Sequence, residues 1–244
     1  MLTFPRTRCE SCGGSCGVGC IEVEVATFIP FWFHDWRGIF IFRNMPYDFK
    51  KEYRHIRGPE IITVQAVNYI SVRGKGNPNE DGGEYQTAIR ILYAVSYTLK
   101  MCRKMDYIIN GYYDYVVPPL EGFWEWNTGC KDKSSMKWLA VMRLPEFVTE
   151  ENFNWAVVTA SSRKKLDCSA ANFMTVNEGQ CVQALHNGAF DDEPLTIALM
   201  DEFIHKHGLV NDITENRLHH EIYLSDARKV PPEKLQTIIR LPVK

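Results

Sequence analysis

The sequence predicts an α+β fold made of two similar β-α-β-β units related by a pseudo-twofold axis. An alternating apolar strand leads into an acidic turn and an amphipathic helix, and the same order returns in the second half of the chain. The last two strands of each unit have no helix between them, which excludes a doubly wound parallel sheet. We expect one antiparallel sheet with helices on one face and a ligand cleft on the other.

The first unit is predicted to begin with a strand in which apolar residues recur at every second position. A glycine-rich acidic turn ends this strand, and apolar residues at helical spacing then predict a long amphipathic helix. Pro118 and Pro119 break the strand that follows. The expected strand, turn, helix and two further strands occupy residues 61–73, 74–83, 84–104, 112–127 and 137–144.

Thr149 is placed to cap a helix that connects the two units. In the second unit, Pro194 lies near the predicted start of the helix and Gly208 lies just past its end. The expected strand, turn and two final strands occupy residues 173–186, 187–192, 221–225 and 237–241. The second unit therefore repeats the first in outline.

Composition narrows the class of protein. With 244 residues and 45% hydrophobic content, the chain can build one large or two small cores. A net charge of -2 and a pI near 6.4 lack the basic surface of a nucleic-acid-binding protein. No stretch approaches the roughly 18 apolar residues that span a bilayer. We expect a cytoplasmic protein with neither a nucleic-acid nor a membrane partner, whose oligomeric state the sequence does not specify.

The first 44 residues differ from the rest. Cys9, Cys12, Cys16 and Cys20 are dense enough for a metal site, but their spacing matches neither a ferredoxin nor a zinc finger. We therefore expect no metal and no cofactor, and keep these cysteines as a weak metal candidate. Met45 begins a run typical of a cytosolic amino terminus. Residues 1–44 are predicted to be an extension of uncertain status, and residues 45–244 the functional domain.

One predicted strand carries an acid where a purely structural strand would carry an apolar group. Glu221 and Tyr223 share one face of this strand, and Ile222 and Leu224 share the other. The preceding pair, His219 and His220, point to opposite faces, so at most one of them reaches the cleft. Their spacing does not indicate a metal site. A half-exposed strand with a solvated glutamate is the alternative interpretation.

The matching strand of the first unit, residues 120–127, is acidic and aromatic. Trp124 and Trp126 lie on one side, Glu125 lies on the other, and Glu121 precedes a glycine. By the pseudo-symmetry, this strand and the Glu221 strand should line the same cleft from opposite sides. Tryptophan suits the binding of planar ligands, although either indole could instead belong to the core. Further candidate ligand-binding residues are Tyr69, His186 and Phe190.

A carboxylate in an aromatic cleft is partly desolvated, which raises its pKa. It can then act as a proton acceptor, or it can pair with a cationic ligand. The sequence indicates the arrangement without choosing between these two functions.

Several segments together resemble the GyrI-like small-molecule-binding family, from about Met45 to Lys244. The matching segments are residues 119–122, 143–151, 191–194, 208–212 and 219–226. The resemblance implies the duplicated fold, a ligand cleft at the symmetry axis, and a role for Glu221 as the acid that meets cationic drugs. One departure is Ala189-Phe190, where relatives usually have proline and tyrosine.

The resemblance also extends to stand-alone members that hydrolyse the cyclopropane ring of cyclopropanoid DNA-alkylating compounds, which is a detoxification. The resemblance then implies that Glu221 activates water and that Tyr223 donates a hydrogen bond. Glu121 and Glu125 are further candidates for the base. Trp124 and Trp126 would hold a planar aromatic or amphipathic small molecule. The alternatives are a non-catalytic sensor or sequestering protein for cationic compounds, and a gyrase-inhibitor-like protein-binding module.

Overall fold

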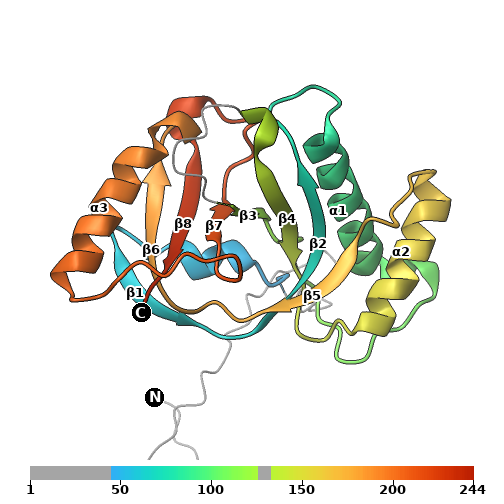
Figure 1. The fold of residues 1–244 in the computed structure, drawn as a ribbon. Helices are drawn as coiled ribbons and strands as arrows, with labels where there is room; N and C mark the ends of the chain where they lie inside the picture. Colours follow the sequence, from blue (N-terminus) through green and yellow to red (C-terminus); the bar gives the residue numbers. More distant parts are fainter. Residues whose placement is uncertain (1–44, 126–132) are drawn as a thin grey trace, which may run out of the picture. The chain divides into compact units, whose positions relative to one another are not determined.

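Figure 1 shows a strongly curved antiparallel sheet with helices packed on its outer face. The computed structural model describes residues 45–125 and 133–244, and the statements below concern these residues. The sheet has eight strands in the order β1-β6-β8-β7-β3-β4-β2-β5. Their bounds are β1 (Glu60–Val64), β2 (Val67–Lys75), β3 (Leu120–Trp124), β4 (Lys137–Arg143), β5 (Asn172–Val176), β6 (Gly179–Asn187), β7 (His219–Tyr223) and β8 (Gln236–Pro242).

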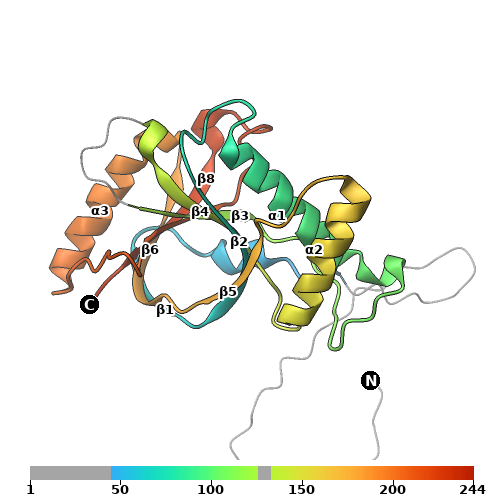
Figure 2. The same cartoon turned by 45° about the vertical axis from the view of Figure 1, so that its right-hand side comes forward.

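The predicted duplication is confirmed. The first unit is β2, α1 (Glu84–Lys100), β3 and β4, and the second is β6, α3 (Glu193–Lys206), β7 and β8. The units meet where β3 pairs with β7 at the middle of the sheet, which is where a pseudo-twofold axis passes. The connecting helix α2 (Glu150–Lys164) packs beside α1 (Figure 2).

Two predicted strands are in fact two strands each. The expected strand 61–73 divides into β1 and β2, and the expected strand 173–186 divides into β5 and β6. β1 crosses to pair with β6 of the second unit, and β5 pairs with β2 of the first. Each unit thus receives its edge strand from the chain preceding the other unit. Apolar alternation continues across the first break, and residues 177–179 carry a turn signal at the second, but no local pattern shows which unit each edge strand joins.

Local signals place the helix ends correctly. Thr149 caps α2 through a capping box with Asn152. The Thr149 hydroxyl accepts a hydrogen bond from the Asn152 backbone N–H, and the Asn152 side chain accepts one from the Thr149 backbone N–H. Pro194 lies in the first turn of α3, and Gly208 follows the helix with a φ of +69°, a conformation that glycine adopts without strain.

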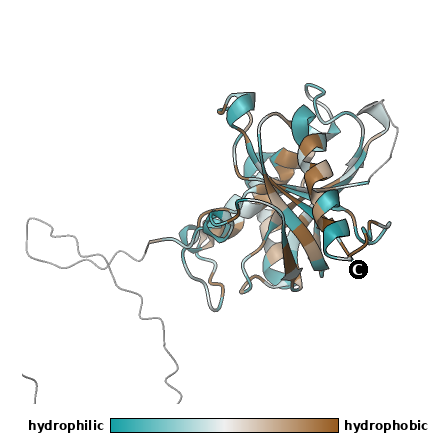
Figure 3. Ribbon diagram, turned by 90° about the vertical axis from the view of Figure 1, so that its left-hand side faces the viewer, coloured by the Kyte–Doolittle hydropathy of each residue, from teal (hydrophilic) through white to brown (hydrophobic). Residues whose placement is uncertain are grey.

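The helices cover one face of the sheet, as expected. On that face α1 and α2 pack over the first unit, and α3 packs over the second, where Met200 and Ile204 contact Ala184 and Ile239. Figure 3 shows brown, hydrophobic segments on the strands and recurring along the helices. The opposite face is partly covered by a short 3-10 helix, Phe49–Tyr53, whose Tyr53 packs against Ile222. The described residues include no helix long and apolar enough to cross a membrane.

Candidate active site

Glu221 lies at the centre of the sheet on the helix-covered face. It is opposite Gly122 of β3 and Ile239 of β8, and its side chain is 12% exposed. Both carboxylate oxygens are held by neighbours on the same strand. Oε1 lies 3.0 Å from Nε2 of His219, and Oε2 accepts a hydrogen bond of 2.7 Å from the hydroxyl of Tyr223. The i, i+2 spacing on β7 creates this arrangement, because alternate residues share a face.

Tyr223 is itself held by Trp124. The indole Nε1–H of Trp124 donates to the Tyr223 hydroxyl oxygen at 3.0 Å, so the hydroxyl proton is directed at Glu221. Burial, together with the charge of Glu221, raises the pKa of Tyr223 well above its usual value, so the proton stays in place. These two consecutive hydrogen bonds, from Trp124 to Tyr223 and from Tyr223 to Glu221, fix the orientation of the carboxylate.

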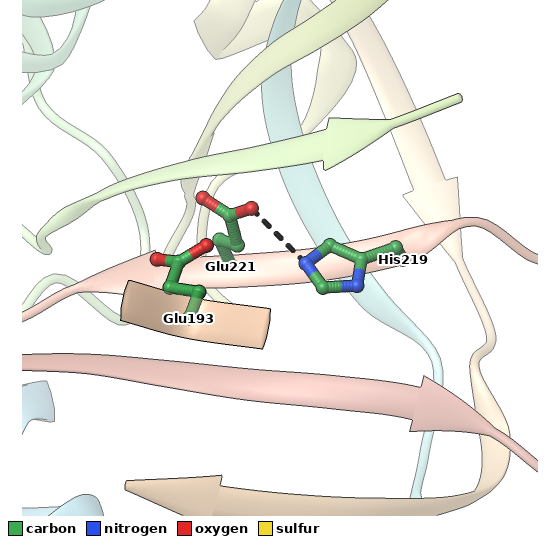
Figure 4. A group of neighbouring side chains, drawn as sticks. All are labelled: Glu193, His219 and Glu221. Atoms are coloured by element: carbon green, nitrogen blue, oxygen red, sulfur yellow. Dashed lines mark hydrogen bonds and ion pairs between the residues drawn. The ribbon is translucent and has the colours of Figure 1, made fainter. Parts of the chain in front are cut away.

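Glu193 is the residue of this site that the sequence patterns did not reveal. It begins α3, is 8% exposed, and points toward Glu221 in Figure 4. Burial and the adjacent Glu221 carboxylate raise its pKa to about 9. Two carboxyl groups this close cannot both be ionised at neutral pH at low cost, so they share one proton. The site therefore offers an acid and a base side by side.

Aromatic side chains enclose the pair. The Trp124 ring lies 5.7 Å from the ring of Tyr85, and the Phe190 ring lies edge-on to Tyr223 at 5.7 Å. Phe190 is 40% exposed and forms the accessible side of the group. Gly122 leaves room here, because a Cβ at its position would lie 2.8 Å from Nε1 of Trp124. The site thus combines an apolar wall with the buried carboxyl group of Glu193 and the partly buried one of Glu221.

Comparison with known proteins identifies the domain. The model of the GyrI-like small molecule binding domain matches residues 58–244. The chain belongs to the GyrI-like family. This identifies the matched region as a small-molecule-binding domain, in agreement with the duplicated fold.

Solved structures from Listeria innocua resemble this GyrI-like domain closely. A crystal structure of a hydrolase is 45% identical, with a TM-score of 0.74, and the match covers 81% of this chain and 100% of that chain. An uncharacterized conserved protein is 47% identical over the same shares, with a TM-score of 0.76. A further hydrolase is 44% identical over 82% of this chain and 100% of that chain, with a TM-score of 0.75. The comparison with curated proteins gives no match.

The structure separates two groups of residues that the sequence placed in one cleft. In the register of β3 and β7, Glu121 is opposite Ile222, so its side chain lies on the face away from Glu221. Tyr69 lies on that same far face, where its ring contacts Phe123 and His220. The expectation that Glu121 and Tyr69 share a cleft with Glu221 is wrong. The prediction that Glu221 lines a cleft on the face without helices is also wrong, because Glu221 lies beside Ile239 on the face that α3 covers.

The remaining predicted residues have different surroundings. Glu125 pairs with Lys137 at 3.0 Å near the surface. His186 is on the Glu221 face but is buried, with its ring nitrogens bonded to the Thr196 hydroxyl and the Ala189 carbonyl. Trp126 lies outside the described residues, as do Cys9, Cys12, Cys16 and Cys20. The described cysteines, Cys102, Cys168 and Cys181, are buried free thiols.

The face without helices holds a buried ionic network. His220 lies between Glu178 at 2.9 Å and Glu121 at 3.0 Å, and Arg240 bonds Glu178 at 2.9 Å. Burial alone would lower the pKa of His220, but the two carboxylates raise it to about 9. Burial would likewise raise the pKa of Glu178, but His220 and Arg240 lower it to about 2. His220, Glu178 and Arg240 are therefore all charged at neutral pH, and each lies against an opposite charge.

Two cavities lie among the described residues. One of about 270 Å³ lies on the face without helices and is lined in part by Phe123, Leu139, Met174 and Glu178. Another of about 400 Å³ lies beside the start of α2 and is lined in part by Tyr107 and Asn152. Glu221 lines neither of them.

Proposed function

We propose that this protein hydrolyses the cyclopropane ring of cyclopropanoid DNA-alkylating compounds and so protects the cell from them. The observation that carries the proposal is the proton-sharing pair of Glu193 and Glu221 beside an aromatic wall. Supporting it, proteins named hydrolases are 44–45% identical to this chain over their full length.

The reaction needs an activated water molecule. Ligand atoms of Glu193 and Glu221 lie within 4.8 Å, a separation that one water molecule can bridge. In this arrangement protonated Glu193 donates to the water oxygen, and Glu221 accepts a proton from it. The water oxygen bonds to a ring methylene carbon, and the carbon–carbon bond of the strained ring breaks. Its electron pair moves into the conjugated dienone, whose carbonyl oxygen becomes a phenolate and takes up a proton from solvent.

Other side chains position these groups. His219 and Tyr223 hold the two oxygens of Glu221, and the orientation of the base is thereby set before a ligand arrives. Phe190, which is 40% exposed, offers a flat apolar surface to a planar alkylator, and the buried Trp124 supports Tyr223 behind it.

The test is incubation of the full chain with a spirocyclic cyclopropane dienone, with the ring-opened product followed by mass spectrometry. We expect turnover above the uncatalysed rate, and a loss of about 10²- to 10⁴-fold in Glu221→Gln, which removes the base. Glu125→Gln is the matched control, because Glu125 belongs to a surface ion pair. Absence of turnover in the natural chain would contradict the proposal.

A second candidate function is a non-catalytic sensor or sequestering protein. Glu221 is a carboxylate enclosed by aromatic rings, which also fits a cationic amphipathic ligand through charge and cation–π contacts. Saturable binding of such a compound, without product and weakened by Glu221→Gln, is the outcome expected from this alternative.

A further inference from the structure

Glu193, His219 and Glu221 form a set of metal-ligating side chains on the helix-covered face. Each contributes one ligand atom, and these atoms all lie within 4.8 Å of one another. His219 and Glu221 come from alternate positions of β7, and Glu193 comes from the first turn of α3 beside them (Figure 4). The set spans two elements, so the packing of α3 on the sheet brings it together.

The donor atoms suit a borderline transition metal. Imidazole nitrogen and carboxylate oxygen bind Zn²⁺ at about 2.0–2.2 Å. Nε2 of His219 and Oε1 of Glu221 are 3.0 Å apart, so an ion at those bond lengths would see them at an angle of roughly 90°. This requires the tautomer of His219 that carries its proton on Nδ1. Alkaline-earth ions prefer sites made of oxygen alone, and the imidazole disfavours them here.

An orphaned buried oxygen independently indicates a missing ligand. Oε1 of Glu193 is buried and has no hydrogen-bond partner among the described residues, and Glu193 itself is 8% exposed. A buried carboxyl oxygen without a donor in the protein is satisfied by a proton, by an ordered water molecule or by a cation, and a cation here would also be within reach of His219 and Glu221.

The surroundings also resemble the outer shell of a metal site. Tyr223 donates to Oε2 of Glu221 and is held by Trp124, so the carboxylate stays aligned with Oε1 directed toward His219. Hydrogen bonds of this kind orient metal ligands and increase affinity.

We propose that Glu193, His219 and Glu221 bind one divalent first-row transition metal ion, with Zn²⁺ the best match to their chemistry. The bound ion occupies the Glu221 lone pair that would accept a proton from water, and it therefore inhibits hydrolysis. Metal binding stands by itself, whereas the inhibition rests on the proposed function.

The experiment measures binding of Zn²⁺ by calorimetry and of Co²⁺ by visible absorption, using the full chain. Cys9, Cys12, Cys16 and Cys20 are replaced by serine in every sample, because their thiolates would also bind these ions. We expect one ion per chain and a Co²⁺ spectrum without thiolate charge-transfer bands. Glu193→Gln and His219→Gln should each weaken binding by at least about tenfold, because each removes a ligand atom.

Matched controls are Glu202→Gln and His205→Gln, which change the same residue types at exposed positions of α3. Unchanged Zn²⁺ affinity in Glu193→Gln and His219→Gln would overturn the proposal, as would a chain with the four serine replacements that binds neither ion. Thermal unfolding without metal checks that each variant is folded. Zn²⁺ should raise the melting temperature of the chain with the four serine replacements and not that of the variants. If Glu193→Gln does not fold, Glu193→Asp replaces it, since its shorter carboxylate should also bind more weakly.

The inhibition is measured separately, as loss of ring-opened product on adding Zn²⁺ and its recovery with a chelator. Stoichiometric binding in a chain with no hydrolase activity would support the metal site and contradict the proposed function. Turnover that Zn²⁺ does not reduce, in a chain that binds no metal, would support the proposed function and contradict the metal site.

Discussion

At the scale of the residue, the decisive feature is that Glu193 keeps its proton beside the carboxyl group of Glu221. Burial disfavours a second charge, and the neighbouring carboxylate disfavours it further, so the pKa of Glu193 rises to about 9. In the proposed reaction one carboxyl group accepts a proton while the other donates a hydrogen bond to the same water. Neither role is encoded by residue type, because two ordinary glutamates acquire them from position.

The pH dependence of hydrolysis should reveal this proton. As pH rises through about 9, Glu193 ionises and can no longer donate to the water, so kcat/KM should fall. Glu193→Gln has no proton to lose at that pH, so its reduced kcat/KM should stay level there. Rates of product formation measure both profiles. The pH range runs from about 6 to about 10.5, so that it extends about 1.5 units above the raised pKa of Glu193. An identical decline in Glu193→Gln would assign the titration to another group.

Tyr223→Phe tests whether orientation of Glu221 matters. The change removes a hydrogen bond to a charged group, which is worth about 1.5–3 kcal/mol, so kcat/KM should fall by roughly ten- to 150-fold. Tyr113→Phe removes a tyrosine hydroxyl that bonds Glu146 at the surface and serves as the control. Equal activity of the two variants would show that Tyr223 does not position the base.

At the scale of the element, the site depends on the register between β3 and β7. Gly122 stands opposite Glu221, and Trp124 stands opposite His219, so the indole of one strand reaches the phenol of the other. The absence of a side chain at Gly122 permits this close approach. A shift by one residue would move Glu121 onto the Glu221 face and Trp124 away from it.

Gly122→Ala should therefore damage the site from inside the strand. Its Cβ would lie 2.8 Å from Nε1 of Trp124 and 3.1 Å from the Tyr223 hydroxyl, and both side chains must shift. We expect a loss of about 1–3 kcal/mol in the free energy of unfolding, together with lower kcat/KM. Denaturant melts and the hydrolysis assay measure the two effects. Gly58→Ala, whose Cβ has no atom within 4 Å, is the control.

At the scale of the whole molecule, the two faces of the sheet carry different groups of charged side chains. One face carries the acid pair under the helices, and the other carries the network of His220, Glu178, Glu121 and Arg240. The network draws on β3, β7 and β8 and on the turn before β6, so it ties the two units together. Removing one charge would leave its partners buried and unpaired.

The stability of the fold should depend on the charge of His220. Its pKa is raised from 6.5 to about 9, so its contribution is complete below 6.5 and is lost as pH rises through 9. Glu193 also loses its proton in that range, so the measurement uses the Glu193→Gln chain. Urea melts across this range should show the free energy of unfolding decreasing. Adding His220→Gln should remove the decrease while lowering stability at every pH. A decrease that persists in the double variant would contradict this assignment.

The boundary between residues 1–44 and 45–244 remains a proposal. The proposed reaction uses side chains from α3, β3 and β7, all of which lie within residues 45–244. We therefore expect a chain of residues 45–244 to keep the kcat/KM of the full chain. A large loss of activity in the shorter chain, with its melting temperature unchanged, would show that the first 44 residues contribute to the site.

Local patterns in the sequence determined the order of the elements, the duplication, the caps of α2 and α3, and the shared face of Glu221 and Tyr223. Each of these follows from the period of a strand or helix, or from a residue at its end. Tertiary structure decided the exchange of edge strands, the separation of Glu121 from Glu221, and the contact of Glu193 with Glu221. Those depend on register and on helix packing, because only the folded sheet brings together residues that are distant in the chain.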